Sequence, residues 1–241
     1  MSVSWLSRSQ MLLGERAIKK LQSAKVAVFG LGGVGSYTVE ALVRTGVGSL
    51  VLIDADTVAD TNRNRQLIAD TTTLGKAKVE VCAARAQAIN PQVQVQQVQE
   101  FILPQSDLSF LQGCDYVVDA IDTVSAKLHI AEYCQKQGIP LICAMGTGNK
   151  TDPTALQVTP IEKTRVCPLC RVMRRELKLR GIGGVKVVYS EEEPLTPIAS
   201  NEETERRSLP GSLIFVPAAA GLLLAKEVVF DLIKEVPHAA K

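Results

Sequence analysis

The sequence has few aromatic residues and no apolar run long enough to span a membrane. Aromatic residues make up 4% of its 241 residues. The longest uncharged apolar stretch, residues 213–225, covers 13 residues, whereas a spanning helix needs about 20, so we expect a buried helix there. The N-terminal segment MSVSWLSRSQ has neither an apolar run nor a small-residue cleavage site, which predicts no secretory signal and a cytoplasmic protein. Its six cysteines are then expected to stay reduced.

The chain also lacks a strong excess of charge of either sign. Its 27 lysines and arginines oppose 25 aspartates and glutamates, a net charge of +2, which is too small to indicate a nucleic-acid-binding protein by itself. The distribution is uneven, because residues 163–186 hold eight basic residues and one acidic residue, and residues 191–206 hold six acidic residues and one basic residue. We interpret these stretches as a basic helix over residues 167–180 and an exposed acidic loop.

Apolar runs that alternate with helical patterns predict an α/β fold, a Rossmann-like and largely parallel sheet flanked by helices. Strands are predicted at residues 25–30, 49–53, 92–99, 116–120 and 139–144. Helices are predicted at residues 9–23, 34–45, 74–89 and 125–137. The length fits a single domain, with a nucleotide-binding core over about residues 1–160 and a C-terminal elaboration over about residues 161–241 that holds the basic helix, the acidic loop and the apolar helix.

A glycine-rich segment lies directly between the first predicted strand and the helix that follows it. Its glycines are Gly30, Gly32, Gly33 and Gly35. Glycine allows a tight turn and lets the backbone approach a phosphate at the positive end of a helix. Asp54 ends the next predicted strand, 19 residues after Gly35, where a carboxylate accepts hydrogen bonds from ribose hydroxyls. These features predict a nucleotide site, and the absence of a GxxxxGK[ST] signature excludes a P-loop.

The segment after Asp54, ADTVADTNRNRQ, is polar and cationic, which favours ATP over NAD because a dinucleotide dehydrogenase does not need such a loop. Arg65, Lys76 and Lys78 are candidates to contact a β,γ-phosphate and to balance its charge during displacement at phosphorus. Taken one at a time, each has an alternative. Arg65 would pair with a surface acid, and the two lysines would be solvated helix residues.

Asp119 and Asp122 come at the carboxyl end of a predicted strand, where open parallel sheets place their ligand crevice. Asp122 is the better candidate for a Mg²⁺ ligand, since this cation needs only one or two carboxylates together with phosphate oxygens and waters. For Asp119, capping of the helix that begins near Ser125 is an equal alternative.

Five segments together resemble the adenylating superfamily that includes ThiF, MoeB, HesA and the ubiquitin-activating enzymes. They are GLGGVGS, LIDADTVADTNRNRQ, GKAKVE, INP and DAIDT. Within this superfamily the chain is most similar to the tRNA threonylcarbamoyladenosine dehydratases of the TcdA or CsdL type. That closer resemblance depends on the TNRNRQ segment, residues 146–159, the basic helix and the late GSLIFVP segment, and it covers nearly the whole chain.

The resemblance implies ATP and Mg²⁺ as cofactors and assigns a role to each site residue. The implied nucleotide ligands are the glycine loop, Asp54 at the ribose, Asn62 and Arg65 on the phosphate side, and Lys78 at the phosphates, with Asp122 as the magnesium ligand. Arg65, Lys78 and Asp122 are the implied catalytic residues. Arg8 lies where related enzymes carry an arginine that reaches the ATP of the partner subunit, which implies a homodimer.

The implied reaction is the ATP-dependent dehydration of threonylcarbamoyladenosine in tRNA. The carboxylate of the modified nucleoside becomes an acyl-adenylate, and a nitrogen of the same side chain then closes a ring and expels AMP. One alternative is an adenylating activator of a ubiquitin-like sulfur-carrier protein, and a more distant one is an NAD-binding module without catalysis. A tRNA is therefore the expected partner, and a sulfur-trafficking protein stays open as a second one.

The cysteines depart from the wider superfamily pattern. ThiF-like and MoeB-like enzymes often carry two CxxC pairs for zinc, whereas here only Cys167 and Cys170 have that spacing, so we expect no zinc. The other cysteines are interpreted as small core residues. They are Cys82, Cys114, Cys134 and Cys143.

Four basic residues of the predicted basic helix recur at spacings of three and four. They are Arg171, Arg174, Arg175 and Lys178. This spacing places them on one helix face that suits an RNA phosphate backbone. The alternative is a solvated face whose charge the acidic loop neutralises.

Overall fold

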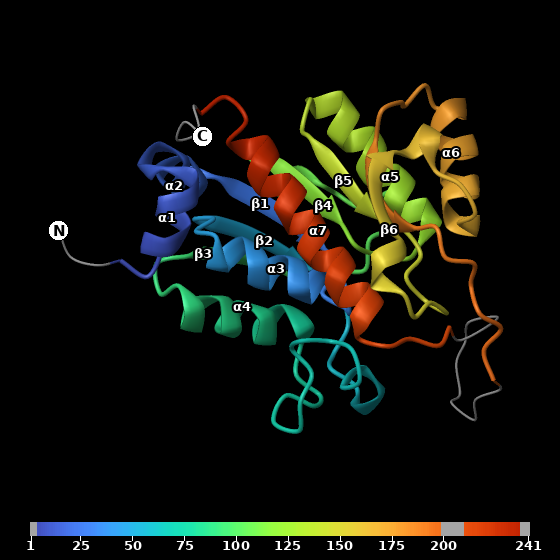
Figure 1. Ribbon diagram of the computed structural model, residues 1–241, viewed down its shortest axis with the longest axis horizontal. Helices are drawn as coiled ribbons and strands as arrows, with labels where there is room; N and C mark the ends of the chain where they lie inside the picture. Colours follow the sequence, from blue (N-terminus) through green and yellow to red (C-terminus); the bar gives the residue numbers. More distant parts are fainter. Residues whose placement is uncertain (1–3, 199–209, 237–241) are drawn as a thin grey trace.

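The apolar runs of the sequence form the central strands of a seven-stranded sheet. The computed structural model describes residues 4–198 and 210–236, and their strand order is β3-β2-β1-β4-β5-β7-β6 (Figure 1). All neighbouring strands are parallel except β6, which is antiparallel to β7. The strands are β1 (Lys25–Phe29), β2 (Ser49–Ile53), β3 (Gln94–Val98), β4 (Tyr116–Asp119), β5 (Leu141–Ala144), β6 (Leu156–Pro160) and β7 (Lys186–Ser190).

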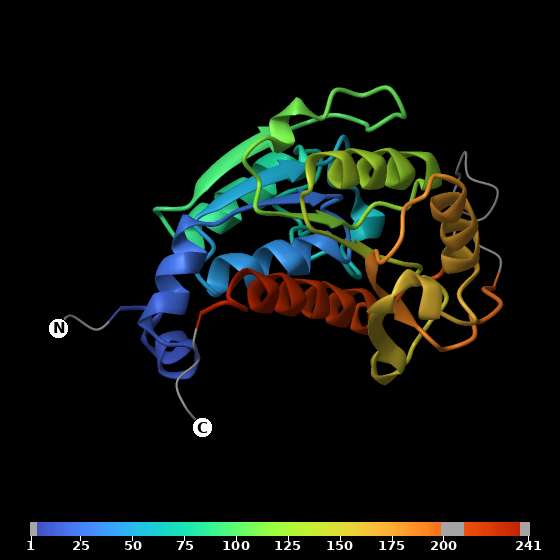
Figure 2. The ribbon, with the colours of Figure 1, turned by 90° about the horizontal axis from the view of Figure 1, so that it is seen from above.

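Helices cover both faces of the sheet, and for this reason the central strands are apolar on both sides. The helices are α1 (Ser7–Leu13), α2 (Glu15–Ser23), α3 (Gly35–Arg44), α4 (Lys78–Ile89), α5 (Val124–Gln137), α6 (Pro168–Leu179) and α7 (Phe215–Leu232). Val26 and Val28 of β1 enter the core formed with α3, α4 and α7, whereas Ala27 and Phe29 enter the core on the α5 side. Figure 2 shows α3 and α7 on one side of the sheet and α5 on the other.

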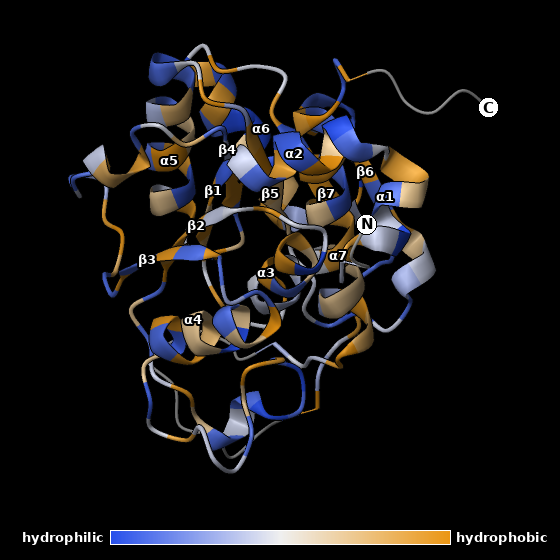
Figure 3. Ribbon diagram, turned by 90° about the vertical axis from the view of Figure 1, so that its left-hand side faces the viewer, coloured by the Kyte–Doolittle hydropathy of each residue, from blue (hydrophilic) through white to orange (hydrophobic). Residues whose placement is uncertain are grey.

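The predicted fold class is confirmed, and all five predicted strands are present. Strand β3 lies at the edge of the sheet and is half-exposed, as its alternating sequence predicts; Figure 3 shows hydrophilic and hydrophobic residues mixed along it. Strands β6 and β7 were not predicted from the sequence. Because β7 pairs with β5, the part of the chain beyond residue 160 completes the same sheet.

Three predicted helix boundaries are wrong. The helix predicted over residues 9–23 is two helices, α1 and α2, because Gly14 between them has a φ of +83° and ends the first one. Helix α4 begins at Lys78 rather than near residue 74, since the preceding residues form hydrogen-bonded turns. Helix α7 extends to Leu232, past the charged residues at which the apolar run stops.

The predicted acidic loop is described only in part. Residues 191–198 have no helix or strand and are mostly exposed, as expected for that loop. Residues 199–206 of the loop, and residues 237–241 at the end of the C-terminal elaboration, lie outside the described residues. In the described part of the chain, no helix is both long enough and apolar enough to cross a bilayer.

Candidate active site

The main polar cleft lies at the carboxyl ends of β1, β2 and β4. Strand β1 sits between β2 and β4, so the chain connections run in opposite directions from this point and leave a crevice between the loops. The cleft has a volume of about 400 Å³. Predicted site residues that line it are Gly30, Gly32, Gly33, Asp54, Asn62, Arg65, Lys78 and Asp122.

The glycine-rich segment forms the floor of the cleft, and two of its glycines are required by packing. Gly30 has a φ of +81°, and a Cβ there would lie 2.8 Å from the carbonyl oxygen of Ala120. A Cβ at Gly35, where α3 begins, would lie 1.7 Å from the carbonyl oxygen of Gly30. Gly32 and Gly33 instead lie open to the cleft, with no atom nearer than 3.3 Å to an added Cβ. The backbone can therefore approach a ligand at the positive end of α3.

Asp54 is held in place by backbone donors at the end of β2. The N–H of Leu31 donates to its Oδ2 at 2.6 Å, and the N–H of Asp56 donates to its Oδ1 at 2.9 Å. Burial raises the pKa of Asp54, although attraction to Lys78 and these two hydrogen bonds oppose the rise. The carboxylate is thus fixed, partly desolvated and still able to accept hydrogen bonds from a bound ligand.

Lys78 is a buried cation at the first position of α4. Its side chain is 6% exposed, and its Nζ donates to Oδ2 of Asp56 at 2.7 Å, whereas the side chain of Asp56 is 65% exposed. Burying the charge of a lysine is unfavourable, and so is placing it at the N-terminus of a helix, which is itself positive. An anionic ligand in the cleft would offset both costs.

Asn62 and Arg65 belong to the turn that closes the phosphate side of the cleft. Oδ1 of Asn62 accepts from the N–H of Ala59 at 3.1 Å, and Nη1 of Arg65 donates to the carbonyl of Thr61 at 2.9 Å. These bonds fix the loop and leave the remaining guanidinium N–H groups of Arg65 available for a ligand.

The two aspartates after β4 have different environments. Asp122 is exposed and lines the cleft. Asp119 is fully buried and forms an ion pair with Lys127 of α5, with 2.9 Å between Oδ2 and Nζ. The residue at the N-cap of α5 is Thr123, so Asp119 serves neither of the roles considered for it, and its charge is neutralised inside the protein.

Comparison with known proteins identifies the family. The model of the ThiF family matches residues 6–240. The chain belongs to the ThiF family. It is similar to the tRNA threonylcarbamoyladenosine dehydratase of Bacillus subtilis, with 41% identity over an alignment that covers 95% of each chain. The crystal structure of the Escherichia coli enzyme TcdA in complex with ATP matches with a TM-score of 0.86 and 34% identity, covering 98% of each chain.

A second E. coli TcdA structure, in complex with AMP, has a TM-score of 0.84 and covers 97% of this chain and 98% of the other. These similarities extend from end to end, and they confirm both the superfamily and the dehydratase branch indicated by the sequence motifs. Most of the residues that the motifs single out line one cleft of this ThiF-family fold, although Gly35 does not.

Two other predicted residues lie outside the ThiF-family cleft. Lys76 is exposed and does not line it. Arg8 is an exposed residue of α1, and α1 lies at the opposite end of the sheet from the glycine loop (Figure 1). Within one chain Arg8 is therefore remote from the cleft, and its predicted contact would have to involve the cleft of another chain.

The structure adds Gln66 to the residues of the cleft. Gln66 is 7% exposed and lines the cleft. Among the described residues, its Oε1 is the one buried side-chain nitrogen or oxygen without a hydrogen-bond partner. Buried polar atoms are almost always paired, so this atom indicates a ligand. In the sequence, Gln66 could have been singled out by its position directly after Arg65 in the NRNRQ segment.

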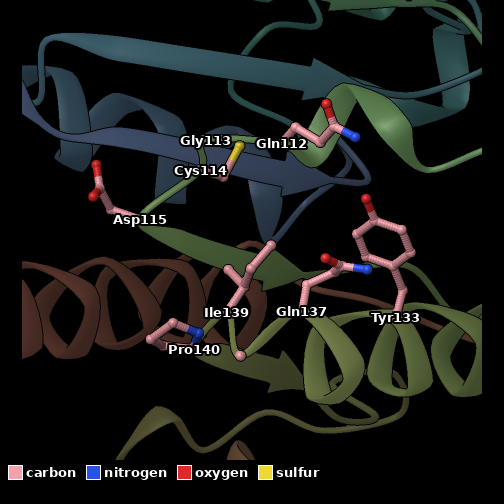
Figure 4. Close-up of a pocket in the computed structure, with 9 residues that line it drawn as sticks. Gln112, Gly113, Cys114, Asp115, Tyr133, Gln137, Ile139 and Pro140 are labelled. Atoms are coloured by element: carbon pink, nitrogen blue, oxygen red, sulfur yellow. The ribbon is translucent and has the colours of Figure 1, made fainter.

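A second hollow lies at the amino ends of β4 and β5, the opposite end of these strands from the cleft (Figure 4). Cys114, Asp115 and Tyr133 are among its lining residues, which include no lysine or arginine. Burial raises the pKa of Cys114 to about 11, so its thiol is not nucleophilic at neutral pH. Because no lysine or arginine lines this hollow, it also lacks the positive charge that a nucleoside triphosphate requires.

The four predicted RNA-contacting residues of α6 line the same hollow but differ in how exposed their side chains are. Arg171, Arg175 and Lys178 are exposed, whereas Arg174 is half-buried and its Nη1 donates to the carbonyl of Thr164 at 2.9 Å. All four line a hollow of about 680 Å³. Arg174 thus has a structural role in addition to any contact with a partner.

Proposed function

We propose that the chain uses ATP to dehydrate threonylcarbamoyladenosine in tRNA by activating its carboxylate. The observation that carries the proposal is that a single cleft collects the glycine loop, Asp54, Arg65, Lys78 and Asp122. This happens in a chain similar over its full length to dehydratases, one of which has been solved with ATP. Because its substrate is tRNA, we place the activity in the cytoplasm.

The nucleotide is proposed to bind along the loops that follow β1, β2 and β4. Asp54 accepts from the ribose hydroxyls, and Gly32 and Gly33 let the backbone approach the phosphates. Phe101 and Ile121, which also line the cleft, form an apolar wall for the adenine ring. The unpaired Oε1 of Gln66 then finds its donor on the bound nucleotide or on a water molecule held with it.

The first chemical step forms an acyl-adenylate. A carboxylate oxygen of the nucleoside attacks the α-phosphorus, the bond to the bridging oxygen breaks, and pyrophosphate leaves. The negative charge grows on the departing pyrophosphate, where Arg65 and Lys78 are proposed to stabilise it. Both cations are fixed by bonds within the protein before the substrate arrives, so little reorganisation is needed.

The second step closes the ring. A nitrogen of the same side chain attacks the activated carbonyl, loses its proton and expels AMP, so the nucleoside has lost one water overall. Both reacting groups belong to one molecule, and holding them together supplies most of the acceleration. No cysteine nucleophile is required.

Asp122 is the residue proposed to hold Mg²⁺. The described residues contain no cluster of three or more metal-ligating side chains, and Asp119 is withdrawn into its ion pair. An exposed carboxylate on the rim of a phosphate cleft fits a hard cation that takes its other ligands from phosphates and water. When bound, the ion neutralises phosphate charge.

The tRNA is proposed to contact the exposed basic residues of α6, namely Arg171, Arg175 and Lys178. The homodimer is proposed because helix α1 has no fully buried residue and exposes Met11 by 81% and Leu12 by 80%. A second copy covering this apolar surface would bring Arg8 to the partner's cleft.

The test is nucleoside mass spectrometry on tRNA that carries threonylcarbamoyladenosine, incubated with the protein, ATP and Mg²⁺. We expect a nucleoside lighter by one water, together with one AMP and one pyrophosphate for each product. Asp122→Ala serves as the inactive control. An unchanged tRNA, combined with adenylation of a protein that has a free C-terminal carboxylate, would instead identify a sulfur-carrier activator.

A further inference from the structure

Cys167 and Cys170 form a thiol pair that the nucleotide chemistry does not use. Cys167 is the N-cap of α6, Pro168 is the first helical residue, and Cys170 lies in the first turn. The two thiols are hydrogen-bonded to each other, and neither is part of a disulfide. Cys167 is 3% exposed and Cys170 is fully buried.

The surroundings of Cys167 favour its thiolate. Backbone N–H groups of Cys170 and Gly146 donate to its sulfur, and the ammonium of Lys150 attracts it. Lys150 is itself buried, with its Nζ donating to the carbonyl of Ser190 at 3.0 Å. The hydrogen bond from the Cys170 thiol is the largest effect, and together with these groups it lowers the pKa of Cys167 to about 5 although burial opposes the shift. The same hydrogen bond raises the pKa of Cys170.

The other cysteines of the chain provide a contrast. Burial raises the pKa of Cys82 and of Cys134 to about 12 each, and Cys143 is also raised. The pair in α6 is therefore chemically distinct from cysteines that are equally buried.

The backbone before Cys167 is strained. Val166 has a φ of +57°, a conformation that is rare for a β-branched residue. The N–H of Cys167 donates across it to the carbonyl of Arg165 at 2.5 Å, which makes a tight three-residue turn. Strain of this kind persists only where the surrounding structure holds it, and it is concentrated at functional sites. Here it fixes the thiol of Cys167 at the start of α6.

We propose that Cys167 and Cys170 are a redox-active dithiol that a small hydroperoxide oxidises to a disulfide. The Cys167 thiolate attacks one peroxide oxygen, the O–O bond breaks, and a sulfenic acid forms while the other oxygen leaves as water or an alcohol. The Cys170 sulfur then attacks the Cys167 sulfur, forms the S–S bond and releases water. Two thiols thus give two electrons and two protons to one hydroperoxide. The oxidant is small because Cys167 is almost inaccessible.

A short segment connects the dithiol to the cleft. Gly146 donates to the Cys167 sulfur, and the next residue, Thr147, lines the cleft. Asn149 exchanges two hydrogen bonds of 2.7 Å with Gly211, whose neighbour Ser212 also lines the cleft. Disulfide formation removes the negative charge that Gly146 faces. The segment then shifts and ATP affinity changes, a consequence that depends on the proposed function.

The first experiment is independent of ATP. The reduced full-length protein is treated with hydrogen peroxide, its remaining thiols are alkylated in denaturant, and its peptides are analysed by mass spectrometry. We expect a Cys167–Cys170 peptide two hydrogens lighter and not alkylated, with Cys82 and Cys143 alkylated. In Cys170→Ser, Cys167 should instead be trapped as a sulfenic acid by dimedone. Equal oxidation of Cys82 and Cys167, or tightly bound zinc that protects both thiols, would overturn the proposal.

The second experiment compares ATP binding by the reduced and peroxide-treated proteins in calorimetry. We expect the dissociation constant to change about fivefold or more on oxidation and to stay constant in Cys170→Ser treated in the same way. Equal constants in the two wild-type forms would overturn the connection to the cleft. If the reduced protein does not bind ATP at all, the proposed function fails, and the peptide analysis alone decides whether the dithiol exists.

Discussion

At the scale of single residues, Lys78 shows most clearly that the cleft is arranged for an anion. Its ammonium is buried at the positive end of α4, and its partner, Asp56, is largely exposed. Neither burial of a cation nor its position at a helix N-terminus benefits the free protein. The arrangement becomes favourable when phosphate charge arrives, and more so as pyrophosphate leaves.

Lys78→Ala is expected to lower turnover about 100-fold or more, as removal of a preorganised transition-state donor typically does. The dissociation constant for ATP should change less, because the positive charge matters most as the leaving group forms. Pyrophosphate release and calorimetry measure the two effects. Lys76→Ala is the matched control, since that lysine is exposed outside the cleft. Lost affinity with unchanged turnover would refute the assignment.

Asp54→Asn tests the cost of a partly desolvated carboxylate. Burial raises the pKa of Asp54, so the native protein binds more protons than the unfolded chain in the acidic range. Its stability therefore falls as pH rises from the ordinary aspartate pKa of 3.8 through the raised value. We expect Asp54→Asn to weaken ATP binding about tenfold or more, through lost charge-assisted hydrogen bonds to ribose. It should also lower the melting temperature at pH 7, because the amide nitrogen cannot accept from one of the two backbone N–H groups that bond the carboxylate. Calorimetry and thermal denaturation measure the two effects, and unchanged ATP affinity would contradict the assignment.

At the scale of elements, α6 combines a structural arginine with exposed basic residues. If the exposed residues contact tRNA phosphates, each alanine substitution at Arg171, Arg175 or Lys178 should make the salt dependence of tRNA binding shallower by about 0.7 to 0.9. Binding titrations over a range of salt concentrations measure this slope. Lys20→Ala on α2 is the control. An unchanged slope in the triple variant would identify a merely solvated face.

Arg174→Ala should behave differently from its neighbours. It removes bonds to Thr164, so we expect a loss of about 1 to 3 kcal/mol in the free energy of unfolding. Chemical denaturation measures it. A purely RNA-binding arginine would leave stability unchanged.

The elements also show what the sequence can predict. Strands β1, β2 and β4 are continuous apolar runs because both faces are buried, and the glycine loop stands out because only glycine fits at positions 30 and 35. Strands β6 and β7 were missed because β6 is a partly exposed edge strand and β7 follows a long basic segment. The roles of Asp119 and Arg174 depend on partners, Lys127 and Thr164, that only the folded chain brings close.

At the scale of the whole molecule, the proposed role of Arg8 at the cleft of a second copy predicts a homodimer in which one chain completes the cleft of the other. Sedimentation should show a dimer. Mixing Arg8→Ala with Asp122→Ala chains should restore part of the activity, because every heterodimer that forms contains one cleft with both residues intact. A monomer, or no restoration in verified heterodimers, would exclude this arrangement.

The most direct test of the central claim follows one oxygen atom through the reaction. Threonylcarbamoyladenosine in tRNA is labelled with oxygen-18 in its carboxylate and incubated with the protein and ATP, and the products are analysed by mass spectrometry. Adenylation followed by ring closure predicts one labelled oxygen in AMP and a nucleoside lighter by one water. Label in inorganic phosphate, or AMP without label, would contradict the account.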